Sequence, residues 1–321
     1  MSHEALETEK LRQEVIDLRQ KNQRSGGFWA ILPFAPFLTA LVAVAGVLIT
    51  LWKQITETNR QKELDRDERE KERKQRLDKQ FNTIATSLGG DTEAIRASGA
   101  VSISMFAKPE YEEYYEQAFM LVLANLKINH TAAVSSLLVN SFEKIARTYL
   151  PRHEGELDFS HLTLTGVNLS GLDLTGADIG HADLRRANFT DATLRRVRGF
   201  GAKCDKARFS RSDLQAARLH EVECPDGQFH DASLIDVKMK GANLQRAQFH
   251  RARLQGAHFK GATLSNAQFQ QANLNEAHFK GASGFTTTTL ESIIRAEHWE
   301  DAHFDDDVRK TLDKLVAERN A

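Results

Sequence analysis

The sequence has little cysteine, little proline and almost no net charge, and each shortage excludes a class of protein. Two cysteines in 321 residues exclude a disulfide scaffold and a zinc ribbon, and they are typical of a reducing compartment. Five prolines exclude a proline-rich linker protein. A formal net charge of −1 excludes a globally basic nucleic-acid binder and a strongly acidic mimic of DNA.

The sequence also lacks the short motifs that mark common catalytic sites. It contains no P-loop, no G-x-S-x-G, no H-E-x-x-H and no C-x-x-C. We therefore expect a protein that is not an enzyme, with no catalytic residues, no metal and no cofactor.

One long apolar run lies near the start of the chain. Residues 28–52 carry no charged side chain, and Trp29 and Trp52 mark the two ends of the run. At about 1.5 Å per residue, a helix of this length crosses a hydrocarbon core of about 30 Å. Residues 28–52 therefore predict a single transmembrane helix in contact with membrane lipid, after a polar tail over 1–27. Pro33 and Pro36 leave a kink or a re-entrant hairpin open.

The side of the membrane that holds the bulk of the chain is less strongly indicated. Lysines and arginines flank the apolar run in similar numbers on both sides. The cysteines are expected to be free thiols, and the charged tail before the apolar run does not have the pattern of a cleavable signal peptide. Both features favour a cytoplasmic location for the bulk of the protein.

A charged segment and a small helical region follow the apolar run. Residues 53–80 place opposite charges four residues apart, which predicts a charged helical stalk; an oligomerising coiled coil is the alternative. Residues 81–150 predict a helical domain of two or three packed helices, with Thr131 as the N-cap of the last one.

A five-residue repeat occupies residues 156–284. A central Leu or Phe recurs in steps of five from Phe159 to Phe279, and Ala most often stands two residues before it. A period of five fits neither a helix nor a strand, so the backbone must turn a corner every five residues. Several of the central phenylalanines are 20 residues apart and are expected to stack on one side of a four-sided coil: Phe189, Phe209, Phe229, Phe249 and Phe269.

Three other central positions carry a small side chain or none. Cys204 and Cys224 should be stacked neighbours inside the coil, where they act as small apolar residues; a disulfide between them is the alternative. Gly199 leaves a central position empty, which predicts a local bulge or kink.

This A-(N/D/x)-(L/F)-x-x pattern resembles that of the pentapeptide-repeat proteins. The resemblance implies a right-handed quadrilateral β-helix, here of about six coils. Residues 285–321 are similar to the helical C-terminal caps of bacterial members. Together with the apolar run over 28–52, this resemblance leads us to expect a protein of the bacterial inner membrane. Homodimers that form through C-terminal ends are common in this family. The fold expected for the whole chain is thus α plus β-solenoid, with a transmembrane helix, stalk, helical domain, β-helix and C-terminal cap.

Positive side chains gather on one predicted side of the coil. The residues immediately before and after every fourth centre, from 199 to 279, are mostly lysine, arginine or histidine. We call the following nine residues the basic stripe: Arg198, Arg218, Lys238, Lys240, Lys260, Lys280, His220, His258 and His278. Such a cluster indicates an anionic partner, such as lipid headgroups, nucleic acid or an acidic protein.

These observations predict a membrane-anchored, non-catalytic scaffold whose rigid rod binds a protein or an anionic surface. Two alternatives stay open. Some pentapeptide-repeat proteins interact with topoisomerase as DNA mimics, although the positive balance of this rod and the membrane segment oppose mimicry and make nucleic acid an unfavoured partner. The other alternative is a membrane stress or defence effector that acts through residues 81–150.

Overall fold

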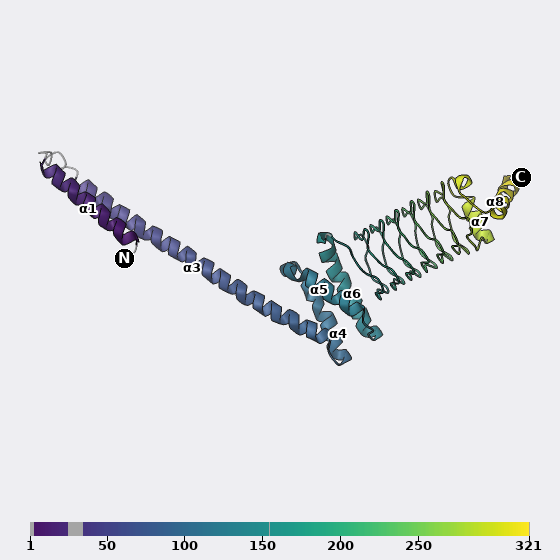
Figure 1. Ribbon diagram of the computed structural model, residues 1–321, viewed down its shortest axis with the longest axis horizontal. Coiled ribbons are helices and arrows are strands. Elements are labelled where there is room, and N and C mark those ends of the chain that lie inside the picture. The colour runs from purple at the N-terminus through teal and green to yellow at the C-terminus, as the bar shows by residue number, and fades with distance from the viewer. Residues whose placement is uncertain (1–2, 25–34, 154, 321) are drawn as a thin grey trace. The chain divides into compact units, whose positions relative to one another are not determined.

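The computed structural model describes residues 3–24, 35–153 and 155–320, and it divides the chain into two units, residues 1–78 and 79–321. The first part of the predicted apolar helix, residues 28–34 with Trp29 and Pro33, lies outside the described residues. The first unit contains α1 (His3–Arg24) and most of α3 (Ala35–Leu88) (Figure 1).

Helix α3 joins the apolar and charged segments without a break. It runs for 54 residues from Ala35, so Pro36 falls in its first turn. An 18-residue window within Thr39–Leu88 has a mean hydropathy of 1.5 and is not buried, and Trp52 is 66% exposed. Length and composition therefore make α3 a candidate membrane span.

Short helices form the first part of the second unit. They are α4 (Glu93–Ser102), η2 (Ile103–Ala107), η3 (Pro109–Tyr114), α5 (Tyr115–Leu126), α6 (Ala132–Tyr149) and η4 (Leu150–Arg152). The predicted N-cap is confirmed, because the Thr131 hydroxyl accepts a hydrogen bond from the amide of Val134. Aromatic rings fill the core between these helices and the last turns of α3, where Phe81 lies 5.1 Å from Phe106.

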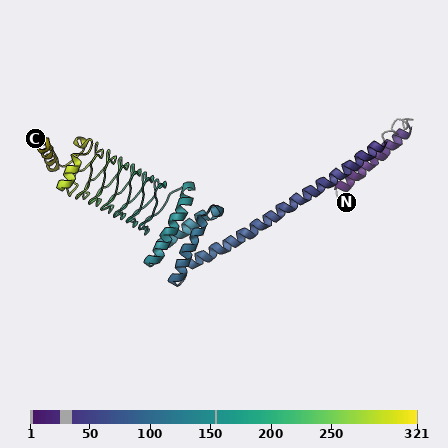
Figure 2. The ribbon, with the colours of Figure 1, turned by 180° about the vertical axis from the view of Figure 1, so that it is seen from behind.

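Residues 156–284 form a column of stacked four-sided coils (Figure 2). Each side contributes one residue to a parallel bridge with the residue 20 positions later, as in Asp158↔Asp178 and Thr163↔Asp183. The amide of each central residue donates to the next coil, as from Phe159 to the carbonyl of Asp178 at 2.7 Å. The predicted four-sided solenoid is confirmed, although single bridged residues take the place of extended strands along it.

The inside of the column is apolar and tightly stacked. Phe209 and Phe229 have ring centroids 5.0 Å apart with planes within 3°, and Phe229 and Phe249 are 4.9 Å apart. The alanines two residues before the centres are buried beside them. The predicted phenylalanine column is therefore confirmed, and its burial supplies the main stabilisation of the fold.

The bulge predicted at Gly199 is wrong. The Gly199 amide donates to the Arg218 carbonyl at 2.8 Å, as in the other coils, and the bridges on this side continue without interruption. Side chains from the neighbouring coils close the space instead, because a Cβ added at Gly199 would lie 2.8 Å from Cδ2 of Leu219 and 3.1 Å from Cγ1 of Ile179. The missing side chain is therefore compensated by packing.

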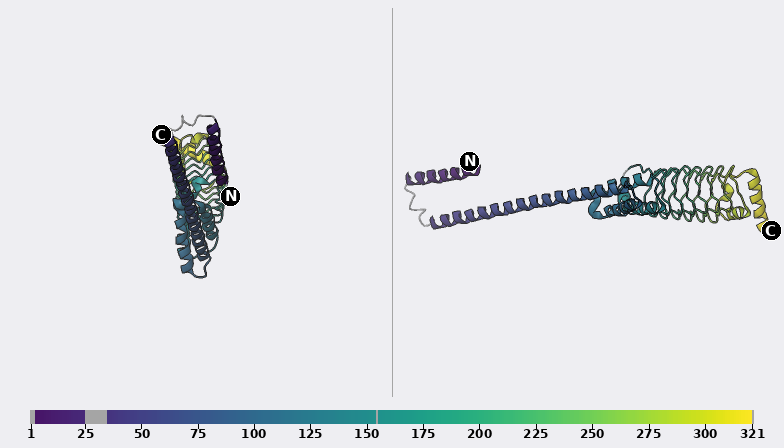
Figure 3. Two further views of the ribbon diagram at one scale, coloured as in Figure 1. Left: turned by 90° about the vertical axis from the view of Figure 1, so that its left-hand side faces the viewer. Right: turned by 90° about the horizontal axis from the view of Figure 1, so that it is seen from below.

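Helices lie at both ends of the column (Figure 3). At the first coil, Phe142 of α6 meets Phe159 edge-on at 5.6 Å, and Lys127 forms a 2.9 Å ion pair with Asp158. The last part of the chain contains α7 (Thr287–Ile293), η5 (Trp299–Asp301) and α8 (Asp306–Asn320).

The coil also continues past residue 284. Glu297 and His303 bridge to Asn273 and His278, and Phe304 stacks on Phe279 at 4.9 Å. Part of the segment expected to be only a helical cap thus forms a further turn of the column.

Candidate functional site: the basic stripe

The basic stripe occupies two of the three outward positions of each coil on one side of the column. The residue before each centre forms a continuous run of bridges, Arg198↔Arg218↔Lys238↔His258↔His278, and the residue after the centre lies beside it in the same coil. The stripe is therefore one aligned surface.

Five of its cations have no ion-pair partner in the described part of the chain. These are Arg218, Lys238, Lys240, Lys260 and Lys280, and all five side chains are exposed. We call them the five unpaired cations. Arg198 differs, because it lies 3.3 Å from Asp178 and 3.9 Å from Glu156. The charge of Arg198, the first residue of the stripe, is thus neutralised by neighbouring carboxylates, whereas the cations of the following coils are not paired.

Histidines stack at the C-terminal end of the stripe. His258 and His278 have ring centroids 4.6 Å apart, and His303 continues the stack at 4.6 Å from His278. Sequence reasoning missed His303, because α7 lengthens the last coil so that His303 follows His278 by 25 residues. Its ring nitrogen lies 2.9 Å from a carboxylate oxygen of Glu276.

The stripe keeps its partly buried histidines largely uncharged near neutral pH. Burial, together with Lys238, Lys240 and Arg218, lowers the pKa of His220, while Glu221 acts in the opposite direction. Burial and the neighbouring imidazoles of His258 and His303 lower the pKa of His278. The positive charge of the stripe at pH 7 therefore comes mainly from lysine and arginine.

Acidic residues bound the stripe at both ends. In the bridged column, Asp158 and Asp178 precede Arg198. Beyond Lys280, a carboxylate oxygen of Asp305 accepts a hydrogen bond from the Gly281 amide at 2.7 Å. Because Asp158 pairs with Lys127 and Asp178 with Arg198, this side carries paired charges first, then the five unpaired cations, and then the carboxylate of Asp305.

Other surface positions in the same column pair opposite charges. At corner positions, Arg211 lies above Asp191 at 2.7 Å, Arg246 above Asp226 at 2.7 Å, and Arg251 above Asp231 at 2.6 Å. The residues of each pair are 20 positions apart and contact each other from adjacent coils. We call these the corner pairs.

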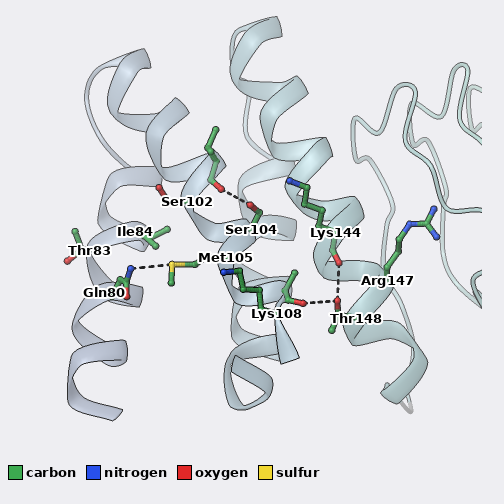
Figure 4. A pocket seen from close by; sticks show the side chains of 12 residues that line it. Gln80, Thr83, Ile84, Ser102, Ser104, Met105, Lys108, Lys144, Arg147 and Thr148 are labelled. Atoms are coloured by element: carbon green, nitrogen blue, oxygen red, sulfur yellow. Dashed lines mark hydrogen bonds between the residues drawn. The ribbon is translucent and has the colours of Figure 1, made fainter. Parts of the chain in front are cut away.

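A second candidate surface is a groove among the helices that precede the column (Figure 4). It has a volume of about 840 Å³ and lies between the last turns of α3, the η2 segment and α6. Ile84, Val101 and Met105 form its apolar part, and Lys108 and Lys144 lie at its edge. The groove shares no residue with the basic stripe.

The two cysteines are buried inside the column as free thiols. The Cys224 thiol donates to the carbonyl oxygen of Cys204 at 3.2 Å. Hydrogen bonding with the Cys204 side chain, and burial, raise the pKa of the Cys224 thiol, which makes it a poor nucleophile. No group of three or more histidines, cysteines or carboxylates that could hold a metal ion occurs among the described residues.

The architecture defines the class of protein: a four-sided solenoid built from five-residue repeats. Two family models match it, one described as pentapeptide repeats (8 copies) over residues 156–191 and one described as a pentapeptide repeat region over residues 207–283. The chain belongs to the pentapeptide repeat proteins through this part of its length.

Solved structures of other pentapeptide-type proteins are similar to parts of this chain. QnrB1, a plasmid-mediated fluoroquinolone resistance protein, matches with a TM-score of 0.36 and 14% identity over 50% of this chain and 88% of its own. HetL, a pentapeptide repeat protein involved in heterocyst differentiation regulation in the cyanobacterium Nostoc sp. strain PCC 7120, matches with a TM-score of 0.24 and 26% identity over 46% and 73%.

A pentapeptide repeat protein from the thylakoid lumen of Arabidopsis thaliana matches with a TM-score of 0.21 and 25% identity over 39% of this chain and 77% of its own. No curated protein sequence matches the chain. At these TM-scores, the similarities carry no information about function.

Proposed function

We propose that this protein is a membrane-anchored, non-catalytic scaffold whose rigid column binds an anionic partner through the basic stripe. The observation that carries the proposal is the set of five unpaired cations, which lie in adjacent coils and form no ion pair with any described residue. Like charges on neighbouring strands oppose each other, so a counter-charge from a partner would stabilise this surface.

The apolar part of α3 supplies the proposed anchor. Its window of mean hydropathy 1.5 is fully exposed, which is unfavourable in water over this length. The mixed-charge part of the same helix suits an aqueous stalk. A single-pass protein of the bacterial inner membrane with its column in the cytoplasm agrees with these features and with the two free thiols.

Photo-crosslinking of the full chain in native membranes tests the proposal. A photoreactive residue replaces Lys260 in the stripe or, as a matched control, Arg253, an exposed arginine without an ion pair on another side of the column. After irradiation, the membranes are extracted at alkaline pH.

We expect the full chain to stay in the membrane pellet and to form a discrete adduct from position 260 only. Release of the chain into the supernatant would contradict the anchor. Equal adducts from positions 260 and 253, or none from either, would contradict the role of the stripe.

A further inference from the structure

The charge profile of the stripe restricts the shape of the partner. The five unpaired cations span four consecutive coils, from Arg218 to Lys280. At a spacing of about 4.8 Å between rungs, this segment is about 14 Å long. It lies between Asp158 and Asp178 at one end and Asp305 at the other.

A large or continuous anion fits this profile poorly. A flat anionic membrane, or a long nucleic acid running along the column, would extend past the positive centre to ends whose carboxylates are paired, as Asp158 is with Lys127 and Asp178 with Arg198. Such an anion would gain little attraction at the ends. A short, linear anion that covers only the four central coils would meet all five unpaired cations, with Glu221 and Glu276 as neighbouring carboxylates.

The type of cation favours an anion without a fixed planar geometry. Four of the five unpaired cations are lysines, which carry a compact charge on a flexible stem. Arginine matches carboxylate and phosphate alike by paired, planar hydrogen bonds, and only Arg218 is available for this. The lysines act as point charges and adapt to anionic groups on a flexible chain, whose positions are not fixed in advance.

The two outward positions of the stripe match an extended peptide. Arg218 and Lys238 stand on one line of the side, where His258 and His278 follow them, and Lys240, Lys260 and Lys280 stand on the other. Side chains of an extended chain alternate in direction, so a peptide lying between the two lines directs carboxylates to the first line in the first two coils and to the second line in the last three. At about 3.3 Å per residue, four or five residues cover the 14 Å segment.

We propose that the basic stripe binds a short, extended acidic segment of a partner protein, four or five residues long and rich in Asp or Glu. This inference rests on the proposed function and names the chemistry of the partner. Recognition is by side chains, because the backbone amides of these coils already donate to neighbouring coils, as Gly241 does to Lys260.

The test uses the full chain in nanodiscs of neutral phosphatidylcholine. The probe is a fluorescein-labelled peptide of five glutamates flanked by glycines, with five glutamines as its uncharged control, and fluorescence anisotropy measures binding. The stripe variant is Lys240→Glu/Lys260→Glu/Lys280→Glu. The matched control is Lys203→Glu/Arg208→Glu/Arg253→Glu, which reverses three exposed, unpaired cations on the other three sides.

We expect the glutamate peptide to bind the wild-type chain and the control variant alike. The stripe variant should weaken binding at least about tenfold, because three attractive pairs become repulsive. Raising the salt concentration should also weaken binding, since these charges are exposed. The variant Lys240→Gln/Lys260→Gln/Lys280→Gln, which adds no new charge, should show a smaller loss, and circular dichroism checks that each variant is folded.

Two results would overturn the inference. Equal loss in the stripe and control variants would show an unspecific charge effect. Absence of peptide binding would refute an acidic segment, and sedimentation with phosphatidylglycerol vesicles then separates two cases. Stripe-dependent binding of the vesicles would leave the proposed function standing with lipid as the anion, whereas no binding of either probe would remove the anionic partner from the proposed function as well.

Discussion

The corner pairs and the basic stripe show two uses of the same geometry. Both consist of residues 20 positions apart that adjacent coils hold in contact, and both are exposed. At the corners the vertical neighbours are Asp and Arg, as in Asp231 and Arg251 at 2.6 Å. In the stripe they are lysines, arginine and histidines. The difference indicates that the surface does not determine the fold, because the same backbone supports attraction in one place and repulsion in another.

The largest expected effect tests whether the buried side chains, and not the two surfaces, provide most of the free energy of unfolding of the column. Phe229→Ala should reduce the free energy of unfolding by about 3–5 kcal/mol, because it opens a cavity between two stacked rings. Phe200→Ala is the matched control, since Phe200 is 47% exposed, and should change it by about 0.5 kcal/mol or less. Thermal unfolding followed by circular dichroism measures the stability of both variants. Similar losses in the two variants would contradict the main contribution of the buried side chains.

The next prediction converts a corner pair into a stripe-like surface. Asp231→Lys removes the partner of Arg251 and places three positive side chains, at positions 211, 231 and 251, above one another. We expect the unfolding midpoint to fall by about 2–4 °C. Asp231→Asn, which only removes the charge, should cause a smaller fall. An unchanged midpoint for Asp231→Lys would show that the corner pairs do not contribute to stability.

A third prediction concerns pH and the histidine stack. Burial, His258, His303 and Lys280 lower the pKa of His278, and Glu276 raises it, so the folded protein binds fewer protons here than the unfolded chain does. Stability should therefore fall as the pH drops through about 6.5, the ordinary value for histidine. Thermal unfolding between pH 7.5 and 5.5 measures this, and His278→Gln should reduce the slope. An identical slope in that variant would contradict a contribution from His278.

The smallest expected effect converts the stripe into a corner-like surface. Lys260→Glu places one carboxylate between Lys240 and Lys280, which should raise the unfolding midpoint by about 1–2 °C. The control is Arg253→Glu. This substitution should leave the midpoint nearly unchanged, because Ser233 and Asn273, the neighbours of Arg253 in the adjacent coils, are uncharged. A lower midpoint for Lys260→Glu would show that the stripe is not under repulsive strain.

The repeat itself was accessible from the sequence because its period is uninterrupted. Counting in fives from Phe159 gives the four sides, and counting in twenties gives the stacked rings at Phe209 and Phe229 and the alignment of the stripe. The corner pairs have the same spacing of 20. The residues directly beside the centres do not include them, because corner residues such as Asp191 and Arg211 stand two positions after a centre. The opposite charges at this spacing of 20 predict the pairs.

Other features depend on packing that a periodic count does not contain. Helix α7 interrupts the period, so the continuation of the column at Glu297 and His303 could not be found in steps of five. Gly199 was expected to distort the coil, but Leu219 and Ile179 approach closely enough to keep it regular. The pairing of Arg198 with Asp178 and Glu156 depends on the directions of long side chains.

The bridge between each residue and the one 20 positions later sets a rule for changes of length. Removing one whole coil shortens the column and returns every later residue to its own side. Removing a single pentapeptide instead turns all later residues by a quarter revolution, so their inner positions still match while their outer faces fall out of phase. A deletion of residues 226–230 would in this way leave Arg218 on one side and bring the lysines of the later coils to the adjacent one, dividing the basic stripe without removing any of its charges.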